Sequence, residues 1–95
     1  MEEDKIIEIG IDKEERLYIK PASKTFPYIY REAMEVHWDN EKAFLYTPKP
    51  KQWTYLNWYN QIIKAAKEQS CKLQLTTATL WVNIPEKLKN EIQAQ

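Results

Sequence analysis

The side chains that could do chemistry in this sequence are few and far apart. His37 is the only histidine and stands two residues before Asp39, so a proton shuttle between an imidazole and a carboxylate can be drawn. The alternation of residue types, however, turns His37 away from the apolar Val36 and Trp38, which is typical of a half-exposed strand residue. We therefore expect His37 to be a surface residue of a sheet and not a general base.

The remaining reactive residue types lack the sequence context that reactivity requires. Cys71 is the only cysteine, so it cannot form an internal disulfide, and one histidine is too few to complete a zinc site. We expect it to be a small buried hydrophobe. Gly10 is the only glycine, which excludes phosphate-binding loops, and neither Ser23 nor Ser70 lies in a nucleophile motif. We expect no enzyme activity, no cofactor and no metal.

The elements that position these residues begin with a hairpin. Apolar and polar residues alternate over residues 7–11 and again over 17–20, which predicts two strands with one apolar face each. The apolar face of the first strand is expected to comprise Ile7, Ile9 and Ile11. The short polar segment Asp12-Lys13-Glu14-Glu15 is typical of a hairpin connection, and Pro21 ends the second strand.

A second hairpin is predicted over residues 34–47. Met34, Val36 and Trp38 alternate with polar residues, residues 39–42 turn the chain, and residues 43–47 return as a strand. The preceding residues, 22–32, fit either an irregular loop anchored by aromatic rings or a short helical turn.

The hydrophobic period changes to three and four residues after Thr54. This spacing continues from Tyr55 to Ala66 and predicts an amphipathic helix that has Thr54 as its N-cap and ends near Ser70. Residues 73–75 indicate a short strand.

Two features of the last twenty residues complete the expected structure. Residues 76–82 fit either a strand or a helical turn, and we favour the turn. Pro85 lies near the start of a last helix, whose apolar stripe comprises Leu88 and Ile92.

Together these elements predict a single α+β domain over residues 1–95, with an antiparallel sheet of about four strands and both helices packed on one face. The chain is 43% hydrophobic, which is enough for one core. No apolar run approaches the roughly 20 residues of a membrane span, and the acidic start is unlike a signal peptide. We therefore expect a cytoplasmic protein.

Charge and aromatic rings are unevenly distributed along the chain. Residues 1–16 hold seven acids and three bases, whereas residues 41–72 hold six lysines and two acids, although the formal net charge of the chain is zero. Nine aromatic residues lie between residues 28 and 59, which is difficult to bury completely in a domain of this size. Exposed Trp and Tyr are enriched at protein interfaces.

In size, lack of catalytic groups, polar character and ring content, the whole chain resembles the small cytoplasmic immunity proteins with which bacteria neutralise secreted toxins. The resemblance implies a non-catalytic module that binds a toxin domain, often a basic nuclease, which the acidic turn at residues 12–15 would meet. Small proteins from mobile gene cassettes, many without known activity, have the same general character. The expected partner-binding residues are Asp12, Glu14, Glu15, Tyr28, Tyr30 and Trp53.

Two other modes of association stay open at this point. Lysines and aromatic residues around residues 49–67 could bind nucleic acid by phosphate neutralisation and base stacking, although a net charge of zero weighs against it. A continuous face of lysines would favour this alternative, and interrupting acids would weaken it. Exposed rings and sheet edges could also support a homodimer.

Overall fold

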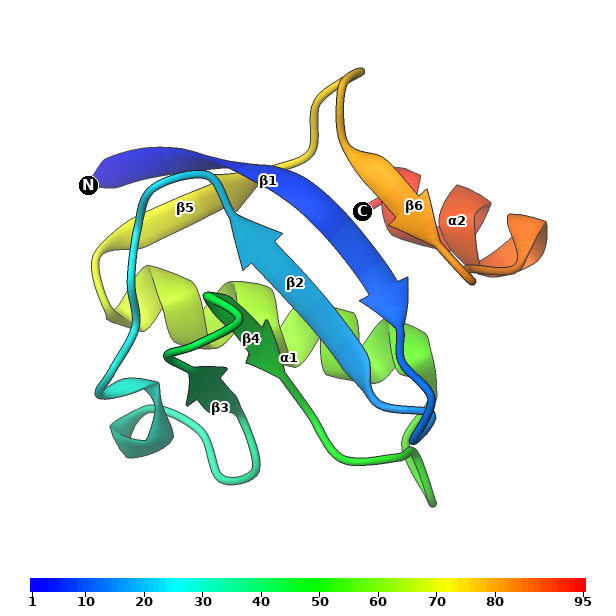
Figure 1. Cartoon of the computed structure of the whole chain (residues 1–95), viewed down its shortest axis with the longest axis horizontal. Coiled ribbons are helices and arrows are strands. Elements are labelled where there is room, and N and C mark those ends of the chain that lie inside the picture. Colours follow the sequence, from blue (N-terminus) through cyan, green and yellow to red (C-terminus); the bar gives the residue numbers. More distant parts are fainter.

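The computed structural model describes residues 1–95 and has an α+β fold of six strands and two α-helices (Figure 1), so the predicted fold class is confirmed. The strands are β1 (Glu2–Ile11), β2 (Leu17–Pro21), β3 (His37–Asp39), β4 (Phe44–Tyr46), β5 (Cys71–Gln74) and β6 (Leu80–Val82). The helices are α1 (Tyr55–Glu68), α2 (Glu86–Gln93) and a single 3-10 turn, η1 (Ile29–Arg31).

The sheet is mixed and larger than the antiparallel sheet of about four strands that the sequence predicts. Its order is β3-β4-β2-β1-β5, and β6 also pairs with β1. The two predicted hairpins, β1–β2 and β3–β4, are antiparallel. The long strand β1 has two further, parallel partners: β5 pairs with its first half at residues 2–5 and β6 with its second half at residues 8–10.

A β-bulge in β1 corrects the predicted apolar face of this strand. The register between β1 and β2 shifts between Ile6 and Glu8, so one extra residue enters the strand. Ile6 and Ile9 are both fully buried, whereas Ile7 is 40% exposed. The prediction that Ile7 belongs to the core was wrong, because the bulge shifts the alternation by one residue at this position.

Residues 76–82 form a tight turn and then a strand, which was the less favoured of the two predicted alternatives. The Thr79 amide donates to the Thr76 carbonyl, and the Thr76 amide donates to Thr79 Oγ1. The hydroxyl of Thr79 donates to the buried Ile6 carbonyl at 2.6 Å, which ties the turn to β1. Leu80–Val82 then forms β6. A helical turn was wrong for these three residues, because their pairing with β1 decides their conformation.

Residues 22–32 combine both predicted alternatives. Phe26 and Ile29 are buried and anchor the segment on the core, and Ile29–Arg31 forms one 3-10 turn.

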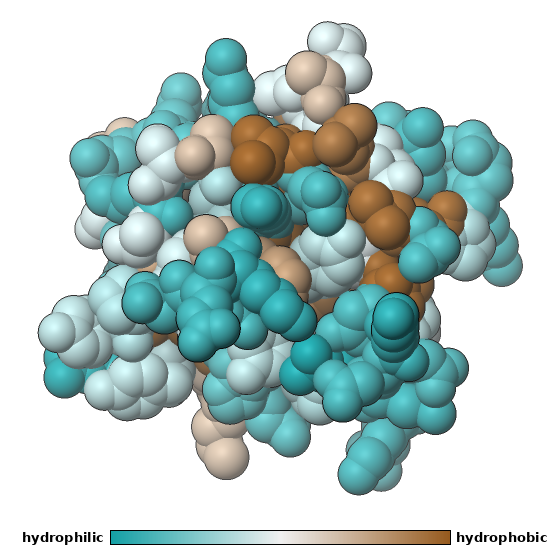
Figure 2. Space-filling view, viewed as in Figure 1, coloured by the Kyte–Doolittle hydropathy of each residue, from teal (hydrophilic) through white to brown (hydrophobic).

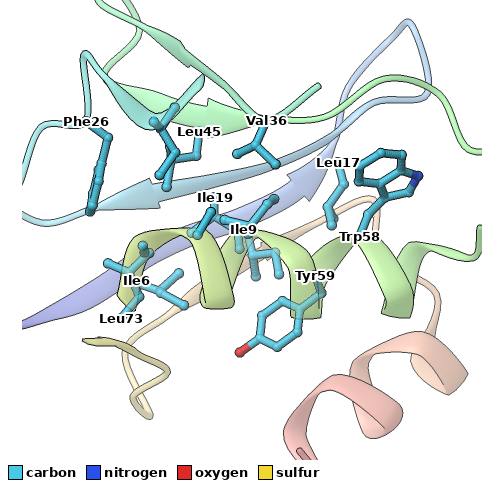
Figure 3. Packing of buried hydrophobic residues seen from close by; sticks show 14 of the residues in the cluster. Ile6, Ile9, Leu17, Ile19, Phe26, Val36, Leu45, Trp58, Tyr59 and Leu73 are labelled. Atoms are coloured by element: carbon cyan, nitrogen blue, oxygen red, sulfur yellow. The ribbon is translucent and has the colours of Figure 1, made fainter. Parts of the chain in front are cut away.

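Helix α1 covers one face of the sheet, as predicted (Figures 1 and 3). Thr54 is its N-cap, and Asn57 completes a capping box by accepting a hydrogen bond from the Thr54 amide. Side chains of α1 and α2 join the isoleucines of the sheet and Cys71 in one core. The buried helical residues are Trp58, Tyr59, Ile62, Ala65, Ala66, Leu88 and Ile92. Neither helix has the length and apolar character of a transmembrane span.

The other face of the sheet carries an aromatic stripe instead of a helix. Tyr18 stacks on Phe44 with 4.8 Å between ring centroids, Phe44 contacts Tyr46, and the Arg16 guanidinium lies over the Tyr46 ring. Figure 2 shows a mainly hydrophilic surface on this side, with apolar surface gathered over β1 and β6. Ile7 and Leu80 contribute exposed apolar surface there.

Candidate binding cleft

A cleft of about 480 Å³ lies between three segments that are distant in the sequence. One wall is the loop before β3, the second is the connection from β4 to α1, and the floor is the first two turns of α1. Pro48 and Pro50 restrict the backbone of the connection, and the Thr54 cap fixes where α1 begins. The lining residues are Met34, Glu35, Pro48, Lys49, Lys51, Gln52, Trp53, Trp58 and Gln61.

Two tryptophans and one methionine give the cleft its apolar character. The rings of Trp53 and Trp58 contact each other with 4.7 Å between centroids and an angle of 48°. Trp53 is 46% exposed and Met34 is 86% exposed, which is unusual for side chains of this size. Glu35 beside Met34 has a φ of 66°, a left-handed conformation that non-glycine residues rarely adopt. Exposure and backbone strain therefore coincide on one wall of the cleft.

The floor of the cleft holds a polar group that the folded chain leaves without a partner. Trp58 is 8% exposed, and its indole Nε1–H is buried and makes no hydrogen bond. Figure 3 shows the Trp58 nitrogen on the side of the ring that faces away from Ile9 and Ile19. Buried donors are nearly always satisfied, so an exception requires an explanation. The half-exposed Trp53 is in ring contact with Trp58.

The charged groups of the cleft rim are partly paired within the chain. Lys49 forms an ion pair with Glu15 at 2.6 Å, and this hydrogen bond raises the pKa of the Lys49 ammonium. The hydroxyl of Tyr55 donates to the Glu15 carbonyl at 2.8 Å. These two contacts attach the β1–β2 turn to the connection that forms the cleft. Lys51 makes no ion pair.

The acidic residues predicted to bind a partner lie together in the β1–β2 turn, outside the cleft. Asp12 Oδ1 accepts the amides of Glu14 and Arg16, both at 2.9 Å, and Asp12 Oδ2 pairs with Arg16 Nε. Burial alone would raise the pKa of Asp12, but these hydrogen bonds and the Arg16 charge lower it. Glu14 pairs with the same Arg16 at 2.9 Å. The carboxylates thus hold the turn together, and their contact with a partner stays a prediction.

The predicted aromatic residues lie in two different places. Trp53 lines the cleft, whereas Tyr28 and Tyr30 are exposed beside η1 and flank Arg31, whose guanidinium lies 4.7 Å and 5.8 Å from their ring centroids. Sequence reasoning missed Met34 and Trp58 as cleft residues. The period-two pattern places Met34 on a strand and the helical period places Trp58 in the core, so neither pattern indicates a shared cleft.

The residues considered for catalysis occupy separate surroundings. His37 is an exposed residue of β3, as predicted, and its ring lies 5.2 Å from that of Tyr46. Asp39 Oδ1 accepts the amides of Glu41 and Lys42 and so holds the β3–β4 turn. Cys71 is fully buried, as expected, and burial raises the pKa of its thiol. No three His, Cys, Asp or Glu side chains are grouped as metal ligands. The arrangement offers apolar contact and hydrogen bonding.

The lysines of residues 49–67 do not form one continuous face. Lys49 and Lys51 line the cleft together with Glu35, and Glu15 neutralises Lys49. Lys67 and Lys72 line a different hollow, which shares no residue with the cleft. This division weakens the nucleic-acid alternative, which depends on an uninterrupted basic surface.

Comparison with known proteins places this structure beside proteins from mobile DNA. The family model for the integron cassette protein Hfx_Cass5 matches residues 4–79, a range that includes every cleft residue. A solved structure from the mobile metagenome of the North West Arm Sewage Outfall, described as integron cassette protein Hfx_Cass5, is 42% identical in sequence. The alignment covers 99% of this chain and 95% of that chain, with a TM-score of 0.51. No curated protein matches this sequence.

Proposed function

This chain belongs to the integron cassette protein family Hfx_Cass5, and from that premise we propose that it is a non-catalytic protein-binding module anchored at the Met34–Trp53–Trp58 cleft. The family name states an origin in mobile gene cassettes, which agrees with one of the resemblances drawn from the sequence, and it states no activity. The observation that carries the proposal is the exposure of Met34 and Trp53 on walls of a cleft whose floor is the buried Trp58.

The side chains of the cleft are the types that dominate binding energy at protein interfaces. Truncation of a tryptophan in such a position commonly weakens binding by about 2 kcal/mol or more. A partner side chain inserted into the cleft would cover Trp53 and Met34 and remove their apolar surface from water. If the half-exposed Trp53 moves aside, an acceptor on the partner could also satisfy the Trp58 Nε1–H.

The groups outside the cleft support a binding role without catalysis. His37 and Cys71 lie in separate surroundings, and Cys71 is fully buried with a raised thiol pKa. A general base and a nucleophile must lie within hydrogen-bond reach of each other or of a bound substrate. We infer that neither residue takes part in a reaction.

The test is affinity capture from the native host with the tagged chain, followed by mass spectrometry with and without nuclease treatment. We expect one stoichiometric protein partner, whose recovery falls about tenfold or more with Trp53→Ala or Met34→Ala. Leu80→Ala, at a 60% exposed residue of β6, is the matched control and should leave recovery unchanged. Equal recovery by all three variants would remove the cleft from the proposal. Nuclease-sensitive recovery of nucleic acid would favour the alternative function, and capture of the untagged chain would indicate a homodimer.

We also propose a specific class of partner, which is a toxin domain with a basic surface. Its support is the general resemblance to immunity proteins and the acidic turn at residues 12–15. Because Asp12 stabilises the turn by its hydrogen bonds, the test reverses the charge of only the exposed Glu14 and Glu15. We expect E14K/E15K to weaken partner binding by an order of magnitude or more. E15K combined with K49E restores the ion pair between residues 15 and 49 with the charges exchanged. This variant therefore shows whether weaker binding comes from a lost contact with the partner or from a less ordered turn. Unchanged affinity of E14K/E15K would rule out a basic partner at this turn.

A further inference from the structure

A second hollow, of about 510 Å³, lies between α1, β5 and α2, and shares no residue with the cleft. We call it the α1–β5–α2 groove. Ile63, Leu73 and Ile92 form apolar parts of its lining, one from each of the three elements. Its volume lies within the range of small-molecule sites, about 300–1,000 Å³. The groove is therefore large enough for a compact organic ligand.

The groove contains a tyrosine whose ring is largely buried and whose hydroxyl has no hydrogen-bond partner within the chain. Tyr59 lines the groove and is only 6% exposed, and its hydroxyl makes no hydrogen bond within the chain. Figure 3 shows this hydroxyl pointing away from Ile9 and Ile19. A tyrosine hydroxyl is protonated at neutral pH and can donate a hydrogen bond, and burial raises the pKa of Tyr59 further. Unlike the Trp58 indole nitrogen, this hydroxyl is not sealed from solvent.

The charged residues of the groove all have the same sign. Lys67 of α1 and Lys72 of β5 line it, neither forms an ion pair, and no Asp or Glu residue is among the lining residues. Glu3 is the neighbour of Lys72 across the β1–β5 pairing but makes no ion pair with it. Two unpaired ammonium groups beside an apolar lining are complementary to an anion with an apolar tail.

We propose that the α1–β5–α2 groove binds a free small molecule that carries a carboxylate on an apolar acyl or aryl group. Lys67 and Lys72 hold the carboxylate at the rim, and the apolar group packs against Ile63 and Leu73. Tyr59 donates its hydroxyl hydrogen to an oxygen of the ligand, because this hydroxyl has no hydrogen-bond partner within the chain. This site is independent of the protein-binding cleft and would give the module a second, small-molecule ligand.

The experiment is isothermal titration calorimetry of the full chain with sodium decanoate, and with decanol and decyltrimethylammonium as neutral and cationic probes of equal chain length. We expect one decanoate per chain, at least about tenfold weaker binding of decanol, and no binding of the cation. K67Q/K72Q should lower decanoate affinity at least about tenfold, since hydrogen bonds to charged groups contribute about 1.5–3 kcal/mol and 1.4 kcal/mol is tenfold. Lys64→Gln, at an exposed lysine of α1 outside the groove, should have no effect.

Two further measurements fix the location of the ligand. Tyr59→Phe keeps the buried ring and removes only the hydroxyl, so the fold should persist by circular dichroism while decanoate affinity falls several-fold. Trp53→Ala should leave decanoate affinity unchanged, which separates this proposal from the one for the cleft. The proposal is wrong if the wild-type chain binds no decanoate, if decanol binds as well as decanoate, or if K67Q/K72Q and Lys64→Gln behave alike.

Discussion

The ring of Tyr18 lies across Gly10 on the uncovered face of the sheet, so closely that a Cβ atom added at position 10 would overlap with the Tyr18 hydroxyl oxygen. The two residues are cross-strand partners in the β1–β2 hairpin. Tyr18 cannot easily move away, because its hydroxyl donates to Glu8 at 2.7 Å and its ring stacks on Phe44. The only glycine of the chain thus makes room for the ring that begins the aromatic stripe.

Gly10→Ala should therefore destabilise the domain, although alanine is favoured over glycine in a strand on conformational entropy alone. We expect a loss of about 1–3 kcal/mol, the usual cost of overpacking, measured by urea denaturation. In a Tyr18→Val background the ring is gone, and Gly10→Ala should cost much less, giving a clear coupling energy in the double-mutant cycle. A Gly10→Ala variant as stable as wild type would contradict the packing argument.

Thr79→Val should be more harmful than its conservative size suggests. The Thr79 hydroxyl donates to the buried Ile6 carbonyl and accepts the Thr76 amide, so valine leaves two backbone groups without these partners. The expected loss is about 1–3 kcal/mol in chemical denaturation. Thr77→Val, at an exposed position two residues earlier, is the control and should stay within about 0.5 kcal/mol of wild type. Equal effects of the two variants would show that the contact with β1 contributes little.

The lowered pKa of Asp12 predicts a loss of stability in acid. Burial raises this pKa, but hydrogen bonds from Arg16 and Glu14 lower it below the model-peptide value of 3.8. Because the folded-state pKa is the lower one, the ionised carboxylate contributes stability that is present above about pH 4 and lost as pH falls through the folded pKa. In denaturation curves between pH 6 and pH 2, the stability advantage of wild type over Asp12→Asn should shrink below pH 4. A constant difference across this range would contradict the assignment.

The thiol of Cys71 should report unfolding. It is fully buried and burial raises its pKa, so both access and thiolate formation are suppressed in the folded state. We expect almost no reaction with an aromatic disulfide reagent in native buffer and rapid reaction of one thiol per chain in urea. The reaction rate should follow the unfolded fraction measured by circular dichroism. Fast modification under native conditions would place Cys71 at the surface.

Local patterns were sufficient to predict the elements whose structure depends on interactions between residues that are close in the sequence. The first hairpin, helix α1 with its Thr54 cap, and the last helix after Pro85 each follow from short-range spacing. The exposed position of His37 and the burial of Cys71 also followed from this reasoning.

The features that were missed depend on partners far along the chain. The bulge that exposes Ile7 is set by the register with β2, and Leu80–Val82 is a strand because β1 lies beside it. The cleft escaped prediction for the same reason, since Met34, Trp53 and Trp58 come from three segments that meet only after folding. Of the residues predicted to bind a partner, Trp53 alone lies in the cleft.

The parallel pairing of β1 also determines how late in synthesis this strand can be fully paired. This strand is made before its parallel partners, which pair Cys71 with Glu2 and Leu80 with Glu8, across more than two thirds of the chain. Contacts of such long sequence separation slow folding, because a long loop must close before they form. On the ribosome, the outer edge of β1 therefore stays unpaired until β5 and β6 emerge, and a nascent chain stalled before residue 71 would present that edge to other chains.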